Sequence, residues 1–209
     1  MSEYSAREER LNVLTHGFGV VLSIIALVLM LIKSFQANES LSIISSLFFG
    51  ISLILLYSAS TLYHSATNPV SRIRLKIFDH AAIFLLIAGT YTPYCLVTLK
   101  GDTGWLIFGV VWSIAILGVI FKLFYTGKYE RLSTIMYLGM GWVIVFAAKP
   151  LMDNLPSLGL YWLVAGGLSY TIGAILYSIK SIPYNHAIFH VFVLLGSFSH
   201  FYSIYNYVL

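Results

Sequence analysis

The sequence predicts an all-α integral membrane protein, a bundle of seven transmembrane helices. Three observations predict this fold class: 59% of the 209 residues are hydrophobic, only 10% are charged, and the mean hydropathy is +0.87. A soluble domain is about half apolar and about a quarter charged, so a polytopic membrane protein is indicated. The net charge of +4 is small and dispersed, which argues against a nucleic-acid-binding surface. The single cysteine, Cys95, excludes an intrachain disulfide and a cysteine-based metal site.

Seven apolar runs are long enough to cross a bilayer, which takes about 20 residues of helix. In chain order, the expected helices cover residues 16–34, 42–64, 78–99, 104–124, 132–148, 158–179 and 185–207. Turn-forming residues separate them at 36–39, 67–69, 101–102, 126–128, 153–156 and 182–185. The first run is long and lacks a small-residue cleavage pattern, so we expect it to remain as a membrane helix. Since no internal repeat stands out, residues 1–209 are predicted to form a single domain.

The basic residues between the runs predict the orientation. Nine of the 12 fall on the side that holds the N-terminus: Arg7, Arg10, Arg72, Arg74, Lys76, Lys122, Lys128, Arg131 and Lys180. The other three, Lys33, Lys100 and Lys149, fall on the opposite side. Because cytoplasmic segments carry the excess of Lys and Arg, we expect the N-terminus in the cytoplasm and the C-terminus outside.

This orientation brings several polar residues to the cytoplasmic side. His64 ends the second run, Asp79 begins the third, and His186 and His190 begin the seventh. Ionisable residues inside a membrane are costly and usually functional. His186 and His190 are four residues apart and so share one helix face. The sequence therefore predicts a metal site made of His64, His186 and His190.

The residue types indicate a catalytic rather than a structural zinc site. Three neutral histidines leave the fourth position of a zinc ion open. Asp79 could offset the charge of the ion, orient a bound water and act as general base. Ser60, one turn before His64, could hydrogen-bond a substrate carbonyl or Asp79.

Three further polar residues lie at the start of the first helix. Glu9, Asn12 and His16 have i, i+3, i+7 spacing and therefore share a face. We expect them to support the metal ligands or to form an entrance to the site.

Each feature also has a structural interpretation. The paired histidines alone could make an interhelical hydrogen bond, Glu9 and Asn12 could be solvated end-caps, and Asp79 could pair with the basic segment 72–76. His80 lies about 100° around the helix from Asp79, and a structural role is favoured for it. His200 lies about 15 Å further along its helix than His190, so a buried polar contact is expected there. For the set of three histidines and Asp79, metal binding is favoured over these structural interpretations. The predicted topology brings these four residues, which are far apart in the sequence, to the same side of the membrane.

Four ordered motifs carry a resemblance over essentially the whole chain. They are Glu9–His16 (ExxNxxTH), Ser60–His64 (SxxxH), Asp79-His80 followed by Ala88-Gly89-Thr90-Tyr91-Thr92-Pro93, and His186–His190 (HxxxH) with His200. Together they resemble the hemolysin III family, the bacterial branch of the progestin and adipoQ receptor (PAQR) family. Phe189 stands where many relatives have tryptophan, and the extended N-terminal region of the animal receptors is absent, which favours the bacterial branch.

The resemblance implies seven helices with zinc (Zn²⁺) held by His64, His186 and His190. It also implies a water between the zinc and Asp79, with Ser60 next to these groups but not bound to the metal. It also implies a multi-pass protein of the bacterial inner (plasma) membrane. Because the family is grouped with alkaline ceramidases, the leading expectation is a zinc-dependent hydrolase of a lipid amide or ester, with a membrane lipid as substrate and a role in lipid homeostasis. Two alternatives stay open: a non-enzymatic sensor of membrane state with structural zinc, and a cytolytic pore, which the apolar outer halves of the helices disfavour.

Overall fold

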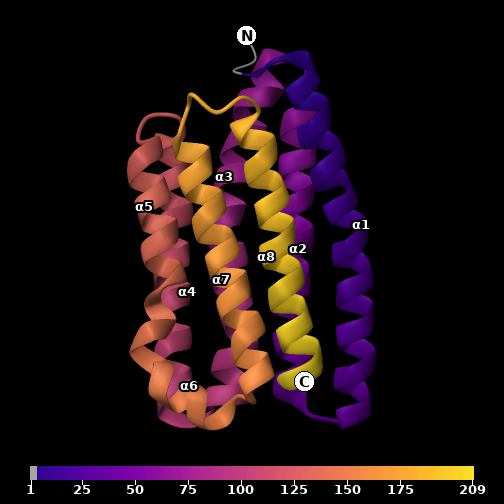
Figure 1. Cartoon of the computed structure of the whole chain (residues 1–209), viewed down its shortest axis with the longest axis vertical. Coiled ribbons are helices and arrows are strands. Elements are labelled where there is room, and N and C mark those ends of the chain that lie inside the picture. Colours follow the sequence, from indigo (N-terminus) through magenta and orange to yellow (C-terminus); the bar gives the residue numbers. More distant parts are fainter. Residues whose placement is uncertain (1–3) are drawn as a thin grey trace.

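The computed structural model describes residues 4–209, which form a bundle of long helices (Figure 1). The elements are α1 (Ala6–Ala37), α2 (Ser40–Ser65), α3 (Pro69–Pro93), the π-helix η1 (Tyr94–Leu99), α4 (Gly101–Tyr125), α5 (Glu130–Gly141), the 3-10 helix η2 (Val143–Ala147), α6 (Ala148–Asn154), α7 (Ser157–Ser178) and α8 (Asn185–Tyr207). They make seven helical spans that are long and apolar enough to cross a membrane. The predicted fold class is thereby confirmed.

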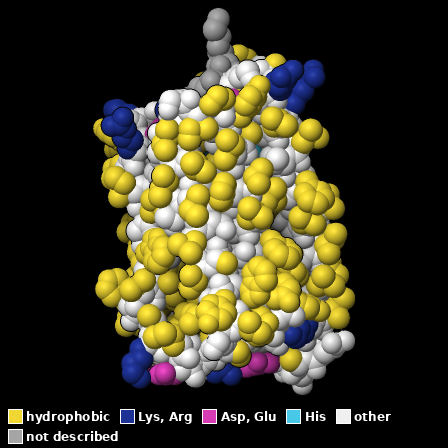
Figure 2. All heavy atoms as spheres, viewed as in Figure 1, with side chains coloured by type: hydrophobic (Ala, Val, Ile, Leu, Met, Phe, Trp, Pro, Cys, Tyr) yellow, Lys and Arg dark blue, Asp and Glu magenta, His cyan; other side chains and the backbone are white. Residues whose placement is uncertain are grey.

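The surface of the bundle is arranged as a membrane requires. Figure 2 shows apolar side chains over the length of the visible face, with Lys, Arg, Asp and Glu gathered at its two ends. The start of α1 and the C-terminus lie at opposite ends of the bundle (Figure 1), as an odd number of crossings demands. We call the end that holds the start of α1 the N-terminal end.

Two helices begin earlier than the apolar runs. α1 begins at Ala6 instead of near residue 16, because Ser5 caps it by accepting a 3.2 Å hydrogen bond from the amide of Glu8. α3 begins at Pro69 instead of near residue 78, because the Asn68 side chain accepts hydrogen bonds from the next two free amides. The basic segment 72–76 therefore lies on the first turns of α3 and not in a loop.

The fifth span is not the continuous helix 132–148 that the sequence suggests. It consists of α5, η2 and α6 and extends to Asn154. Tyr91 of α3 compensates for the break: its hydroxyl donates to the carbonyl of Gly141 at 2.7 Å and accepts from the amide of Ile144 at 2.9 Å. Non-helical backbone at membrane depth is stable only where such partners satisfy it.

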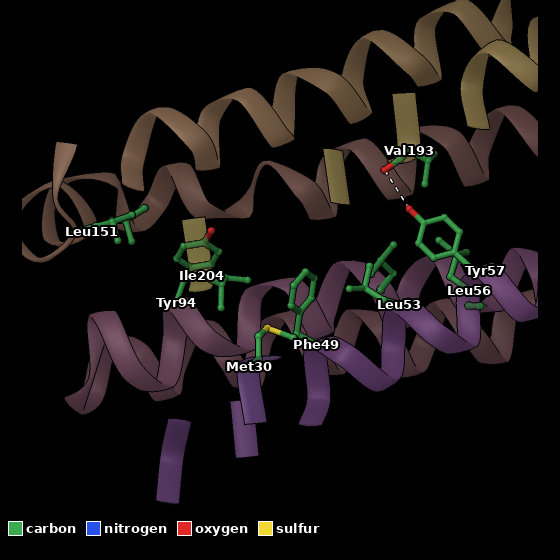
Figure 3. Packing of buried hydrophobic residues seen from close by; sticks show 12 residues of the cluster. Met30, Phe49, Leu53, Leu56, Tyr57, Tyr94, Leu151, Val193 and Ile204 are labelled. Carbon is green, nitrogen blue, oxygen red and sulfur yellow. Dashed lines mark hydrogen bonds between the residues drawn. The ribbon is translucent and has the colours of Figure 1, made fainter. Parts of the chain in front are cut away.

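The largest apolar cluster packs between α1, α2, α3, η1, α6 and α8 (Figure 3). Its fully buried members include Met30, Phe49 and Ile204. Toward the N-terminal end the interior becomes polar: the hydroxyl of Tyr57 donates to Ser197 at 2.7 Å, and the hydroxyl of Tyr170 lies 2.9 Å from the same oxygen. The histidine cluster lies at this polar end of the core.

Candidate metal centre

Three histidines from two distant helices meet near the N-terminal end of the bundle. His64 comes from the last turn of α2, and His186 and His190 come from the first two turns of α8. All three are buried, and their potential ligand atoms lie within 4.8 Å of one another. Nε2 of His186 is 3.1 Å from Nε2 of His64 and 3.0 Å from Nε2 of His190. The predicted convergence of the three side chains is present.

These separations suit a small cation. Zn–N bonds of about 2.0–2.1 Å in a tetrahedron place the nitrogens roughly 3.3–3.4 Å apart. The observed distances are only slightly shorter, so a small adjustment of the rings would accommodate an ion. Three buried imidazole nitrogens facing one another are also poorly satisfied without a shared cation or proton. The triad can therefore hold a metal ion.

Each ligand histidine is held by a partner on its other ring nitrogen. Nδ1 of His64 lies 2.6 Å from the Glu9 carboxylate and 3.3 Å from the Asn12 amide. Nδ1 of His186 lies 3.1 Å from the Tyr4 hydroxyl. Nδ1 of His190 lies 3.4 Å from the Thr15 hydroxyl. Such partners orient metal-binding imidazoles and leave the Nε2 lone pairs for the metal. The N-terminal segment and α1 thus support all three ligands.

Arg72 extends this support to α3. Its guanidinium forms an ion pair with Glu9, donates to the carbonyls of Tyr63 and Ala66 at 3.3 Å and lies over the Tyr63 ring, 4.6 Å from its centroid. Glu9 therefore bridges His64 and Arg72, and α1, α2 and α3 are joined around one ligand.

His16 takes a different position from Glu9 and Asn12. Its ring stacks on that of His190, with centroids 3.4 Å apart and planes 8° apart, and meets the edge of Tyr57 at 5.0 Å. Neither ring nitrogen of His16 has a hydrogen-bond partner in the described residues. His16 fixes the plane of a ligand ring by packing.

A cavity of about 390 Å³ adjoins the triad. At the N-terminal end, His186, His190, Ser60 and Asp79 all line it. The Ser60 hydroxyl makes no hydrogen bond within the described part of the chain. The cavity continues between mostly apolar side chains toward α6. Asp79 and Ser60, the two residues predicted to be catalytic, therefore line the same cavity as His186 and His190.

Asn185 lies at the start of α8, whose N-cap is Tyr184; its side chain donates to the carbonyl of Tyr177 at 2.7 Å, which ties α8 to α7. His80, for which a structural role was favoured, lines the same cavity as Asp79. His200 lies against α7, with its ring 5.4 Å from that of Tyr170, and takes no part in the triad.

Three residues of the site were not predicted as part of it: Tyr4, Thr15 and Arg72. Tyr4 precedes the recognised motif, and Arg72 was considered as a charge that sets orientation and as part of the basic segment that could pair with Asp79. Thr15 stands within the ExxNxxTH motif, so a signal for it existed. Nothing in the local sequence distinguishes Tyr4 or Arg72 from ordinary surface residues, because their partners lie on other helices.

The fold and the site define a class of protein: a seven-helix membrane protein with a buried histidine triad that can hold a metal at one end of the bundle. The family model described as "Haemolysin-III related" matches residues 4–201, and the chain belongs to this family. It is 44% identical over 203 residues to "Hemolysin-3" of Bacillus cereus, covering 97% of this chain and 93% of that protein.

Two other relatives show the range of the family. The chain is 45% identical over 201 residues to "Hemolysin-3 homolog" of Bacillus subtilis (strain 168), covering 96% of this chain and 94% of that protein. It is 28% identical over 207 residues to human "Monocyte to macrophage differentiation factor", covering 96% and 84%. The resemblance inferred from the four motifs is confirmed.

Proposed function

We propose that this protein is a zinc-dependent membrane hydrolase that cleaves an amide or ester bond of a lipid and so contributes to membrane lipid homeostasis. One observation carries the proposal: His186 and His190 of the buried triad line the same cavity as the Asp79 carboxylate. A site with three nitrogen ligands leaves one position for water or substrate, which is the arrangement of catalytic zinc centres. A carboxylate beside that position is the group a hydrolytic reaction needs.

The residues of the chain have distinct roles in this proposal. A bound zinc ion would supply Lewis-acid chemistry, which polarises a carbonyl and makes water a stronger acid. Asp79 accepts the proton of the attacking water as its oxygen bonds to the carbonyl carbon. Asp79 then delivers that proton to the leaving nitrogen or oxygen as the carbonyl bond to it breaks. Ser60 holds the carboxylate in place or donates to the substrate carbonyl oxygen.

The cavity suits a lipid better than a soluble substrate. Its volume of about 390 Å³ lies within the range of roughly 300–1,000 Å³ that is usual for small-molecule sites. Leu56, Ile83, Leu86 and Val193 are among the apolar side chains along it. An acyl chain would lie among these residues while its amide or ester group reaches the triad.

The proposed location is the bacterial inner membrane, with the N-terminus and the metal site toward the cytoplasm. The support is the excess of Lys and Arg at the N-terminal end. Reporter fusions to the C-terminus give a direct test: a periplasmic reporter should be active there and a cytoplasmic reporter inactive. The opposite pattern would reverse the orientation.

The deciding experiment replaces Asp79 with Asn in the purified, zinc-loaded protein. Turnover of a ceramide-type N-acyl amide should be lost while the bound zinc per chain stays unchanged, since Asp79 is not one of the three ligands. Asp102→Asn, an exposed position at the opposite end of the bundle, is the matched control and should leave the rate unchanged. Equal rates for Asp79→Asn and the parent protein would sink the assignment of Asp79 as the base.

Two other functions make different predictions. A sensor of membrane state with structural zinc would show no amide turnover, would tolerate Asp79→Asn in function, and would lose fold stability in His186→Ala. A cytolytic pore, which the names of the Bacillus relatives suggest, would release a trapped dye from proteoliposomes, with or without a chelator. Dye retention by zinc-loaded protein that hydrolyses the amide would favour the hydrolase.

A further inference from the structure

A buried lysine lies outside the metal centre and has no role in the proposed chemistry. Lys122, in the last turn of α4, is only 2% exposed and lines the same cavity. Among residues 4–209 its ammonium group makes no hydrogen bond or ion pair, and it lies 5.8 Å from the centroid of the Tyr137 ring. A buried ammonium group has three donors and is costly when they are unsatisfied. Lys122 is therefore a candidate for ligand binding.

Several residues of α3, α4 and α5 that line this cavity together with Lys122 are polar. We call this set the Lys122 arm: His80, Lys122, Glu130, Ser133, Thr134 and Tyr137. The carboxylate of Glu130 already pairs with Lys76 at 3.4 Å. Glu130 and Lys76 therefore offset each other's charge, and Lys122 is the remaining charged donor of the arm. The hydroxyls of Ser133 and Thr134 already donate to the carbonyls of Tyr129 and Glu130, at 2.9 and 3.1 Å.

The arm is continuous with the metal centre. Tyr137 lines it, and the hydroxyl of Tyr137 donates to the carbonyl of His80 at 2.9 Å. His80 is the direct neighbour of Asp79, and both line the cavity that His186 and His190 also line. A single molecule can therefore reach both Lys122 and the triad.

A lysine near the carboxyl end of a helix also has a simpler explanation. The carbonyls of the last turn attract cations, and long basic side chains often extend along apolar surface to reach water. Lys122 fits neither description well. It is almost fully buried, and within the described part of the chain its ammonium group donates to no carbonyl of α4.

We propose that the Lys122 arm is a subsite for an anionic oxygen group, a phosphate or carboxylate, carried on the head of a lipid whose chain lies in the adjoining cavity. Lys122 pairs with the anion through its ammonium group. The role of this subsite in substrate recognition rests on the proposed function: the protein would select lipids with a negatively charged head. The binding itself needs no metal and can be measured separately.

The test measures binding by thermal unfolding, because a ligand that binds the folded state raises the midpoint in a concentration-dependent way. The detergent-solubilised full chain is titrated with dodecyl phosphate, with dodecanol as the neutral match and inorganic phosphate as the free ion. Dodecyl phosphate should act at concentrations at least tenfold lower than either. Equal action of dodecanol would overturn the anionic subsite, and equal action of inorganic phosphate would overturn its assignment to a lipid.

Lys122→Met should remove the preference for dodecyl phosphate over dodecanol. Lys128→Met, an exposed lysine on the loop that follows α4, should keep it, and so should the charge-conserving Lys122→Arg. If Lys122→Met does not fold, Lys122→Gln replaces it, and a preference that persists in the uncharged variant refutes the proposal. Loss of the preference with intact hydrolysis of a neutral amide would confirm the subsite but not its use in catalysis. Asp79→Asn should keep the preference, so failure of the hydrolase proposal would be seen separately.

Discussion

The Glu9 carboxylate lies 2.6 Å from Nδ1 of His64. This contact joins the first and second spans at a histidine whose other ring nitrogen faces His186. Loss of a hydrogen-bonding partner of a metal ligand typically weakens metal affinity about 10–100-fold. Glu9→Gln should therefore weaken zinc binding by about that factor, as measured by competition with a chromogenic chelator. Asp153→Asn, whose pair with Lys149 is exposed, is the control; equal affinity of the two variants would contradict the role of Glu9.

The three histidines should each be required for stoichiometric metal. His186 contacts both of the others, so we expect His186→Ala to lose bound zinc completely, and His64→Ala and His190→Ala to retain at most a small fraction. Elemental analysis of the purified variants measures this. His200→Asn changes another buried histidine of α8 outside the triad and should keep full occupancy. If bound zinc persists in all three alanine variants, the metal binds at a different site.

The stacking of His16 on His190 predicts that the shape of the His16 ring matters more than its nitrogens. His16→Phe should keep the metal affinity, because neither ring nitrogen has a hydrogen-bond partner in the described residues. His16→Ala should lower the free energy of unfolding by about 0.5–1.5 kcal/mol through loss of the ring contact alone. Thermal unfolding and metal competition on both variants check this. A strong loss of metal in His16→Phe would instead make the His16 nitrogens part of the site.

The contact of α4 with the π-helix η1 predicts contrasting effects at two glycines. A Cβ added at Gly104 would lie 2.2 Å from the carbonyl oxygen of Cys95, whereas one at Gly109 would meet nothing within 4 Å. Gly104→Ala should therefore destabilise the protein by about 1–3 kcal/mol through overpacking. Gly109→Ala should be neutral or slightly stabilising, since alanine favours helix. Similar unfolding midpoints for the two variants would show that α4 and η1 pack less closely.

Removal of the metal should loosen the end of the bundle where α2 and α8 meet. A chelator should lower the unfolding midpoint of zinc-loaded protein, and added zinc should restore it, because the ion binds the folded state in preference to the unfolded state. His186→Ala should have a lower midpoint that no longer responds to the chelator. A midpoint that falls equally in both proteins would show that the chelator acts at a different site.

Much of the architecture could be predicted from the sequence because the membrane imposes simple rules. Apolar runs of sufficient length predict helices, and residues 4–209 contain seven such helical spans. The bounds of α8 agree with the expected 185–207. Where the prediction was wrong, local hydrogen bonds outside the apolar pattern decided the outcome. The caps at Ser5 and Asn68 extend α1 and α3, and the Tyr91 hydroxyl permits the break in the fifth span.

The sequence by itself determined the membrane class, the candidate metal ligands, and Asp79 and Ser60 as neighbours to consider, since helical spacing and topology restrict where ionisable residues in apolar spans can meet. Only the tertiary structure revealed what surrounds them. Tyr4, Arg72 and Lys122 have no local signal, because each acts on residues of other helices. A shared cavity and a hydrogen bond between helices depend on how side chains pack across the bundle. The periodicity of residues within one helix does not predict that packing.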